Sequence, residues 1–193
     1  MTKAINPWKT KGSKVIYDNP WIKVVENDVI NPSGGKGIYG VVHYKNIAVA
    51  VIPIDEDGNT YLIGQYRYTL DSYEWEIPMG GGSKKDSNLE SAKRELLEET
   101  GIVAEHWENI LETQVSNSVS DEISITYLAW GLRFENATPE ETEDLKMKKL
   151  PLSEAITLAV NGEIKDAISV ASLLKLNYLL ENKLILSFKN KFK

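Results

Sequence analysis

The sequence predicts an α+β fold in which helices pack against a mixed β-sheet. Strand-forming residues dominate the first half of the chain, and a strand-turn-strand pattern occupies residues 48–65. A helix, further strands and more helical segments follow, and layer rules place such helices against one sheet. A chain of 193 residues is expected to form one domain with a sizeable core.

Each element follows from its local residues. Short runs rich in Val, Ile, Tyr and Trp predict strands at 14–17, 21–30, 38–44, 48–54, 61–65, 75–78, 110–115 and 123–134. Turn residues separate some of them at 31–35 and at 55–59, where Asp-Gly supports a hairpin. Apolar stripes predict helices at 152–161 and 167–180. The acidic run at 135–143 is expected to be a surface loop.

Composition excludes several classes of protein. The chain has no cysteine, so disulfides and thiolate metal sites are not available. It contains no run of about 20 apolar residues, and its N-terminal residues lack the apolar segment of a signal peptide. These features predict a cytoplasmic protein without a membrane partner. A net charge of −6 argues against a nucleic-acid partner.

Three glutamates stand out at helical spacing. Glu95, Glu98 and Glu99 lie at i, i+3 and i+4, which places their carboxylates on one face of a helix. Like charges at that spacing repel, and a divalent cation such as Mg²⁺ or Mn²⁺ would offset the repulsion. The alternative is a solvated acidic face without a ligand.

The residues around these glutamates predict a loop and a helix. Three glycines at 80–82 are expected to form a loop that can adopt positive φ and approach a ligand closely. The helix should begin near Asn88, with Ser87 or Asn88 as its N-cap, and end at Gly101 in the left-handed conformation. Arg94 is expected to orient one of the glutamates. The apolar face of the helix consists of Leu89, Ala92 and Leu96.

Taken together, these residues resemble the Nudix box. The box is a glycine, five residues, a glutamate, seven residues, and then Arg-Glu-aliphatic-any-Glu-Glu-any-Gly-aliphatic. Gly80 and residues 94–102 match it, and Asp86 stands where the family usually has glutamate. Segments 65–67, 75–78 and 162–167 are similar to the ADP-ribose pyrophosphatase branch of the family.

The resemblance implies an architecture and a reaction. The fold would be an α/β/α sandwich over residues 45–193, preceded by an N-terminal β-region at 1–44 that commonly forms a homodimer in this branch. The reaction would be Mg²⁺- or Mn²⁺-dependent hydrolysis of the pyrophosphate bond of ADP-ribose or another nucleoside diphosphate sugar, a small-molecule substrate. The alternatives are a Nudix hydrolase acting on GDP-mannose or a nucleoside triphosphate, and a non-catalytic module with the same fold.

The resemblance also implies roles for particular residues. The expected metal ligands are Glu95, Glu99, Glu98 and the Met79 carbonyl. The expected catalytic residues are Glu122 and Glu98, with Glu122 as the base and Asp121 as its alternative. Substrate binding is expected at Arg67, Tyr66 and Glu76, because a guanidinium can hold phosphate through two hydrogen bonds and tyrosine can stack on a base or ribose. Asp86 is expected only to support the ligands.

Overall fold

The computed structural model describes residues 5–137 and 144–185, so most of the acidic run expected at 135–143 lies outside the described residues. The chain divides into two compact units. The N-terminal unit comprises the chain up to Asn46 together with Gln114–Glu122, and the central unit comprises Ile47–Thr113 and the chain from Ile123 onward.

The N-terminal unit is built on an antiparallel sheet of three strands, in the order β1 (Lys9–Asp18), β2 (Ile22–Ile30) and β3 (Lys36–Tyr44). The turn between β2 and β3 is the one expected from the sequence. The N–H of Gly34 donates to the carbonyl of Asn31 at 2.9 Å, and Gly34 has a φ of 85°. A residue without a Cβ is suited to this left-handed position.

The central unit contains a mixed sheet, as predicted. Its path runs β10-β5-β4-β9-β8, with β6 paired to β5 and β7 paired to β4, and β4 and β9 are parallel. The strands are β4 (Asn46–Ile54), β5 (Asn59–Arg67), β6 (Ser72–Glu76), β7 (Met79–Ser83), β8 (Ile102–Gln114), β9 (Ile123–Phe134) and β10 (Lys146–Pro151). The helices are α1 (Asn88–Thr100), α2 (Leu152–Val160) and α3 (Ala167–Glu181).

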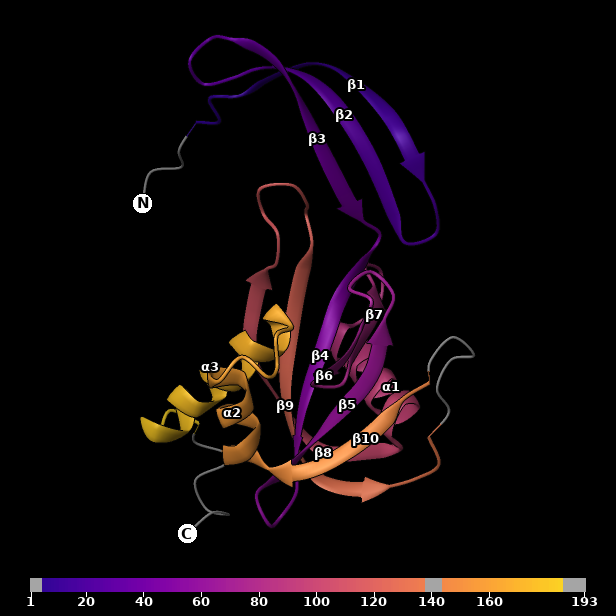
Figure 1. The fold of residues 1–193 in the computed structure, drawn as a ribbon, viewed down its shortest axis with the longest axis vertical. Coiled ribbons are helices and arrows are strands. Elements are labelled where there is room, and N and C mark those ends of the chain that lie inside the picture. The colour runs from indigo at the N-terminus through magenta and orange to yellow at the C-terminus, as the bar shows by residue number, and fades with distance from the viewer. Residues whose placement is uncertain (1–4, 138–143, 186–193) are drawn as a thin grey trace. The chain divides into compact units, whose positions relative to one another are not determined.

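Helices cover both faces of this sheet, with α1 on one side and α2 and α3 on the other (Figure 1). On the first face, Ala92 and Leu96 of α1 pack with Val49 and Val51 of β4 in one buried apolar cluster. The second face meets α3, where the hydroxyls of Thr126 and Ser172 lie 2.8 Å apart. The architecture is therefore the expected α/β/α sandwich. Within the described ranges, no helix is both long and apolar enough to cross a bilayer.

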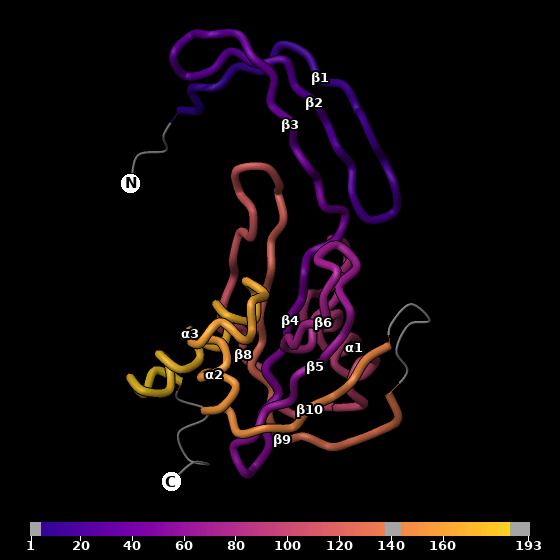
Figure 2. The backbone as a smooth tube through the Cα atoms, in the orientation of Figure 1, coloured from indigo at the N-terminus to yellow at the C-terminus, as the bar shows by residue number. Residues whose placement is uncertain are grey.

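The structure corrects the sequence-based expectations at β7, β8 and β10. It also lengthens the first strand to Lys9–Asp18 and places β6 at Ser72–Glu76. The glycines at 80–82 belong to strand β7, and neither Gly80 nor Gly82 has positive φ, because pairing with β4 holds the backbone extended. Strand β8 begins at Ile102, not at residue 110, directly after the helix ends. Strand β10 was not predicted, because its sequence KMKKLP shows no apolar alternation. It lies at the edge of the sheet beside β5 (Figure 2).

Candidate active site

Helix α1 holds the three glutamates of the acidic motif. Its length matches the prediction, and it ends as predicted at Gly101, which has a φ of 70° and donates its N–H to the carbonyl of Leu97 at 2.8 Å. Ser87 is the N-cap, but its side chain makes no capping hydrogen bond. Burial of the apolar face fixes the rotation of the helix, so Glu95 and Glu99 are only 8% and 6% exposed. Buried carboxylates need hydrogen-bond or charge partners.

Arg94 supplies charged partners to two of the glutamates. Its Nη2 donates to Glu95 Oε1 at 2.7 Å and its Nη1 donates to Glu98 Oε2 at 2.6 Å. Nη2 also donates to the backbone carbonyl of Gly81 at 3.0 Å, which ties the helix to β7. Burial by itself lowers the pKa of Arg94, but the carboxylates of Glu95 and Glu98 more than offset this and raise it. Arg94 therefore orients two glutamates, where the sequence predicted one.

The backbone of β7 contacts the carboxylates of Glu99 and Glu95 directly. The N–H of Met79 donates to Glu99 Oε2 at 2.9 Å. A Cβ added to Gly80 would lie 2.2 Å from Glu95 Cδ, closer than any real contact. Glycine is therefore required at position 80 because Glu95 packs against the backbone there. Close approach, and not positive φ, is the reason for this glycine.

The donor set fits a divalent cation. Carboxylate and carbonyl oxygens are the ligands that Mg²⁺ and Mn²⁺ prefer, and Glu95, Glu98 and Glu99 follow one another within about one turn of α1. Glu99 also contacts the β7 backbone. In the described part of the chain, no three acidic or histidine side chains are gathered as a ready-made metal cage. Two of the three glutamates, Glu95 and Glu98, instead form ion pairs with Arg94. Asp86 is exposed at the turn before α1.

A second polar group lies at the ends of β5 and β6. The Nε of Arg67 donates to Glu76 Oε1 at 2.9 Å, and its Nη2 pairs with Glu76 Oε2. The bidentate hydrogen bond to Glu76 raises the pKa of Arg67 above its ordinary value, and the charges of Asp166 and Glu99 add to this effect. The side chain of Glu76 is only 6% exposed, whereas that of Arg67 is 36% exposed. Arg67 therefore keeps a solvent-facing part while one edge of its guanidinium is fixed.

Asp166 is a residue whose role the sequence reasoning missed. It is the N-cap of α3, and its side chain accepts a hydrogen bond from the N–H of Ser169 at 2.7 Å. Its negative charge acts on Arg67, as described above. An aspartate immediately before a predicted helix is a capping signal, so the role of Asp166 as N-cap could have been predicted from the sequence. Only tertiary structure brings it near Arg67.

Tyr66 is placed differently from Arg67. Consecutive strand residues point to opposite faces, so the side chains of Tyr66 and Arg67 do not converge. Tyr66 is 58% exposed, and its hydroxyl donates to Asp71. The hydrogen bond to the Asp71 carboxylate raises the pKa of Tyr66.

The two acids considered as the base belong to the N-terminal unit. Both oxygens of Asp121 have partners within that unit: His43 Nδ1 at 2.8 Å and the N–H of Tyr44 at 2.8 Å. Burial raises the pKa of Tyr44, and the negative charge of Glu122 raises it further. The choice of Glu122 as the base stays a prediction.

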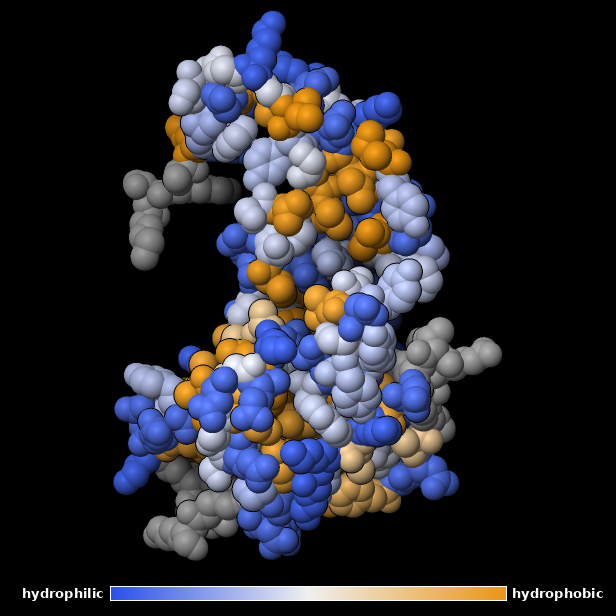
Figure 3. Space-filling model, in the orientation of Figure 1, coloured by the Kyte–Doolittle hydropathy of each residue, from blue (hydrophilic) through white to orange (hydrophobic). Residues whose placement is uncertain are grey.

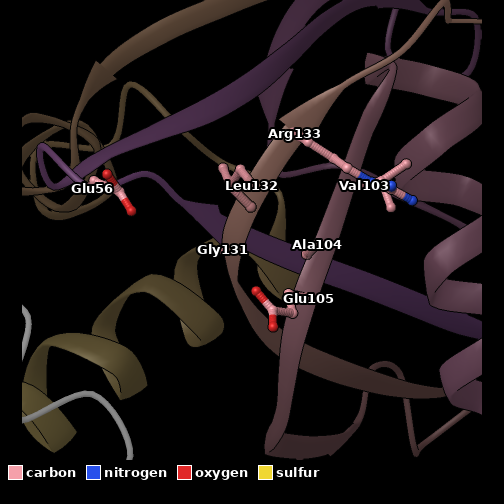
Figure 4. Close-up of a pocket in the computed structure, with 7 residues that line it drawn as sticks. All are labelled: Glu56, Val103, Ala104, Glu105, Gly131, Leu132 and Arg133. Carbon is pink, nitrogen blue, oxygen red and sulfur yellow. The ribbon is translucent and has the colours of Figure 1, made fainter.

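A cavity of about 500 Å³ lies elsewhere in the central unit (Figure 4). Its lining comes from the β4–β5 turn, β8 and β9, namely Glu56, Val103, Ala104, Glu105, Gly131, Leu132 and Arg133. Its charged side chains do not converge, because Arg133 extends away from Glu56 and Glu105. None of the predicted site residues lines it. The chemistry therefore points to α1 and β7, not to this cavity.

Comparison with known proteins agrees with the motif and the fold. The profile of the NUDIX domain matches residues 44–171, so the chain belongs to the Nudix hydrolase family. A profile described as nucleoside diphosphate sugar hydrolase N-terminal domain matches residues 8–42. The chain is accordingly a Nudix pyrophosphatase with the N-terminal region of the nucleoside diphosphate sugar hydrolases.

Two relatives and one solved structure match most of the chain. The chain is 32% identical over 176 residues to the ADP-ribose pyrophosphatase of Mycobacterium tuberculosis, covering 89% of this chain and 84% of that protein. It is 33% identical over 164 residues to the methanol dehydrogenase activator of Bacillus methanolicus, covering 84% and 88%. A solved structure of an ADP compounds hydrolase superposes with a TM-score of 0.83 at 22% identity over 94% of this chain and 98% of that chain, which shows a shared fold.

Proposed function

We propose that this chain hydrolyses the pyrophosphate bond of ADP-ribose, or of a closely related nucleoside diphosphate sugar, in a Mg²⁺-dependent reaction. The products would be a nucleoside monophosphate and a sugar phosphate. One observation carries the proposal: Glu95 and Glu99, 8% and 6% exposed, lie one turn apart on α1 against the backbone of β7. The match to an ADP-ribose pyrophosphatase and to the N-terminal region of nucleoside diphosphate sugar hydrolases supports the choice of substrate.

Glu95, Glu98 and Glu99 would hold the cation, together with the Met79 carbonyl. When bound, Mg²⁺ or Mn²⁺ neutralises charge on the pyrophosphate oxygens and lowers the pKa of an attacking water. Arg94 pairs with both Glu95 and Glu98, and Glu98 is the more accessible, with its side chain 28% exposed against 11% for Glu95. We therefore assign Glu98 a second role, as a catalytic residue at the solvent side of the helix.

Glu122 would act as the general base. Its carboxylate takes a proton from the attacking water, the water oxygen forms a bond to one phosphorus, and the bridging P–O bond breaks. The leaving phosphate takes the electron pair of that bond. A positioned base of this kind contributes on the order of 10²–10⁴-fold to the rate.

Arg67 would bind the phosphates. Its contact with Glu76 uses Nε and Nη2, which fixes the plane of the guanidinium and leaves Nη1 pointing out of that pair. Glu76 thus contributes to substrate binding by orienting Arg67. Tyr66, on the other face of β5, would contact the base or ribose of a substrate that reaches around the strand. The exposure of its ring supports that role.

The N-terminal unit would form a homodimer. The unit exposes large apolar side chains on its strands and on the turn between β1 and β2, namely Val15, Ile16, Tyr17, Trp21 and Ile38, each at least 50% accessible. Hydrophobic residues gather over this sheet in the space-filling view (Figure 3). Exposed apolar patches of this kind mark interaction surfaces, and a closed two-fold dimer is the commonest assembly. Light scattering at micromolar protein that gives the mass of one chain would rule out the dimer.

A substrate panel tests the proposed reaction. ADP-ribose, GDP-mannose and ATP are each incubated with the protein and Mg²⁺, and the products are identified by phosphorus NMR. We expect the highest kcat/KM for ADP-ribose, with release of AMP and ribose 5-phosphate, and no reaction after chelation. Preference for ATP over both diphosphate sugars would overturn the substrate assignment. Turnover of none of them would favour a non-catalytic role.

A further inference from the structure

We propose that Ser169 of helix α3 is a positioning residue for the cation site, because its hydroxyl holds the corner between β6 and β7 and so fixes the Met79 backbone beside Glu99. The proposal rests on the proposed function in taking Met79 and Glu99 as cation ligands. All of these residues belong to the central unit. Ser169 is 0% exposed, so it acts through the corner and not by contact with the cation.

The corner consists of two residues, Ile77 and Pro78, between the end of β6 at Glu76 and the start of β7 at Met79. Both are buried, and a buried backbone N–H needs a hydrogen-bond partner. Proline has no N–H, so Ile77 supplies the single backbone donor of the corner. That N–H donates to Ser169 Oγ at 3.1 Å. The partner of this donor thus comes from a helix 92 positions further along the chain.

The next backbone groups tie the chain to two other elements. The carbonyl of Pro78 accepts from the N–H of Val51 in β4 at 2.9 Å. The N–H of Met79 donates to Glu99 Oε2 in α1 at 2.9 Å. Three consecutive residues therefore bind α3, β4 and α1 in turn. Because peptide units are planar and stiff, a shift of the Ile77 amide is passed on to Met79.

Ser169 is fixed within the first turn of α3. It is the third residue of the helix, and its N–H donates to Oδ2 of the N-cap Asp166 at 2.7 Å. Alanine forms helices better than serine, so the helix by itself gives no reason for a hydroxyl at this buried position. The contact with Ile77 gives one, because it satisfies a donor that would otherwise be buried without a partner.

Two backbone atoms of Met79 connect the corner to the cation. Its N–H orients the carboxylate of Glu99, which is only 6% exposed, and its carbonyl is the proposed backbone ligand. Mg²⁺ requires a nearly octahedral set of oxygen ligands, so displacement of either oxygen should weaken binding. Loss of a residue that orients metal ligands typically lowers metal affinity about 10- to 100-fold.

The test compares two serines on the buried side of α3. Ser169→Ala removes the acceptor of the Ile77 N–H. Ser172→Ala is the matched control, because Ser172 is also 0% exposed and its hydroxyl lies 2.8 Å from that of Thr126 in β9. Each variant loses one buried hydrogen bond, so both should lower the urea midpoint by a similar amount.

The first readout is the affinity for Mn²⁺, which takes the same oxygen ligands as Mg²⁺. It is measured without substrate from the EPR signal of the free ion. Ser169→Ala should raise the Kd for Mn²⁺ roughly 10-fold, at the lower end of the usual range because the contact acts through the backbone. Ser172→Ala should leave the Kd unchanged. Glu99→Gln should raise it strongly, which identifies the measured binding as that of the α1 carboxylates.

Wild-type Mn²⁺ affinity in Ser169→Ala would overturn the proposal. An equal loss of affinity in Ser172→Ala would also overturn it, because Ser169 would then act only through general stability. Unchanged binding in Glu99→Gln, or no binding in the wild type, would remove the cation site at α1 and this proposal with it. Failure of the substrate panel alone, with the expected Mn²⁺ results, would overturn only the proposed function.

Amide exchange measured by NMR tests the corner directly. The Ile77 N–H should exchange faster in Ser169→Ala than in the wild type, and at the wild-type rate in Ser172→Ala. Ser169→Cys nearly keeps the size of the side chain and weakens its acceptor, so it should show the same effects to a smaller extent. It replaces Ser169→Ala if that variant does not fold. Wild-type protection of Ile77 in the Ser169 variants would overturn the role of Ser169 at the corner.

Discussion

Gly80→Ala should separate activity from stability. The added Cβ would lie 2.2 Å from both Cδ and Oε2 of Glu95 and 2.6 Å from its Oε1. Carbon atoms in contact are separated by about 3.5–4.0 Å, so the carboxylate must move by more than about 1 Å. Gly80 lies in β7 without positive φ, so alanine is compatible with the backbone and the effect is steric.

The expected losses of stability and of activity in Gly80→Ala differ in size. A carboxylate at the end of a side chain can swing aside, so the free energy of unfolding should fall by only about 1–2 kcal/mol, at the lower end of overpacking effects. Displacement of a metal ligand by about 1 Å should reduce kcat/KM on the order of 10²-fold. The assay is kcat/KM on ADP-ribose with saturating Mg²⁺, beside urea unfolding of the same preparation.

Two other glycines serve as controls. A Cβ at Gly82 would meet Ser91 at 3.0 Å and Val49 at 3.2 Å, not a carboxylate, so Gly82→Ala should cost stability with a smaller loss of activity. At Gly40 no described atom lies within 4 Å, so Gly40→Ala should be nearly neutral. Near wild-type kcat/KM in Gly80→Ala would show that the position of Glu95 does not govern turnover and would refute the reasoning.

Three further predictions concern single charges. Glu99→Gln should keep the fold and lose turnover by orders of magnitude, whereas Asp86→Ala, at an exposed position, should lose much less. Equal losses in steady-state assays would make Asp86 a primary ligand. Arg67→Ala should raise KM more than it lowers kcat, and a fall in kcat alone would contradict phosphate binding. The same substitution should lower the free energy of unfolding, measured in urea, by about 3 kcal/mol, because Glu76 is left buried without its partner. Asp55 has a pKa lowered to about 2, because hydrogen bonds from Lys149, Asn59 and Tyr61 outweigh its burial. The ionised Asp55 carboxylate therefore stabilises the fold above about pH 4, and this stabilisation is lost as the pH falls towards 2. Asp55→Asn should lower the free energy of unfolding by about 1–2 kcal/mol at pH 7. The difference from wild type should become smaller in unfolding curves measured at acid pH.

The sequence by itself determined helix α1 and the acidic motif. Glu95, Glu98 and Glu99 share a face because a helix repeats every 3.6 residues, and Gly101 ends the helix because it tolerates the left-handed conformation. These relations join residues a few positions apart, so they can be read from spacing alone. The same holds for the turn at residues 31–35 and the hairpin at 55–59. The mixed sheet followed from the order of such local signals, and the family from the resemblance of residues 80–102 to the Nudix box.

Tertiary structure decided the contacts between residues far apart in the chain. Gly80 and Glu95 meet because β7 pairs with β4 while α1 packs on the same face. The strand β10 exists because β5 offers it an edge, not because its own residues alternate. His43 and Asp121, 78 positions apart, join β3 to a segment that leaves the other unit. Strand pairing and side-chain contacts at such separations depend on where the whole backbone goes, which no local pattern of residues encodes.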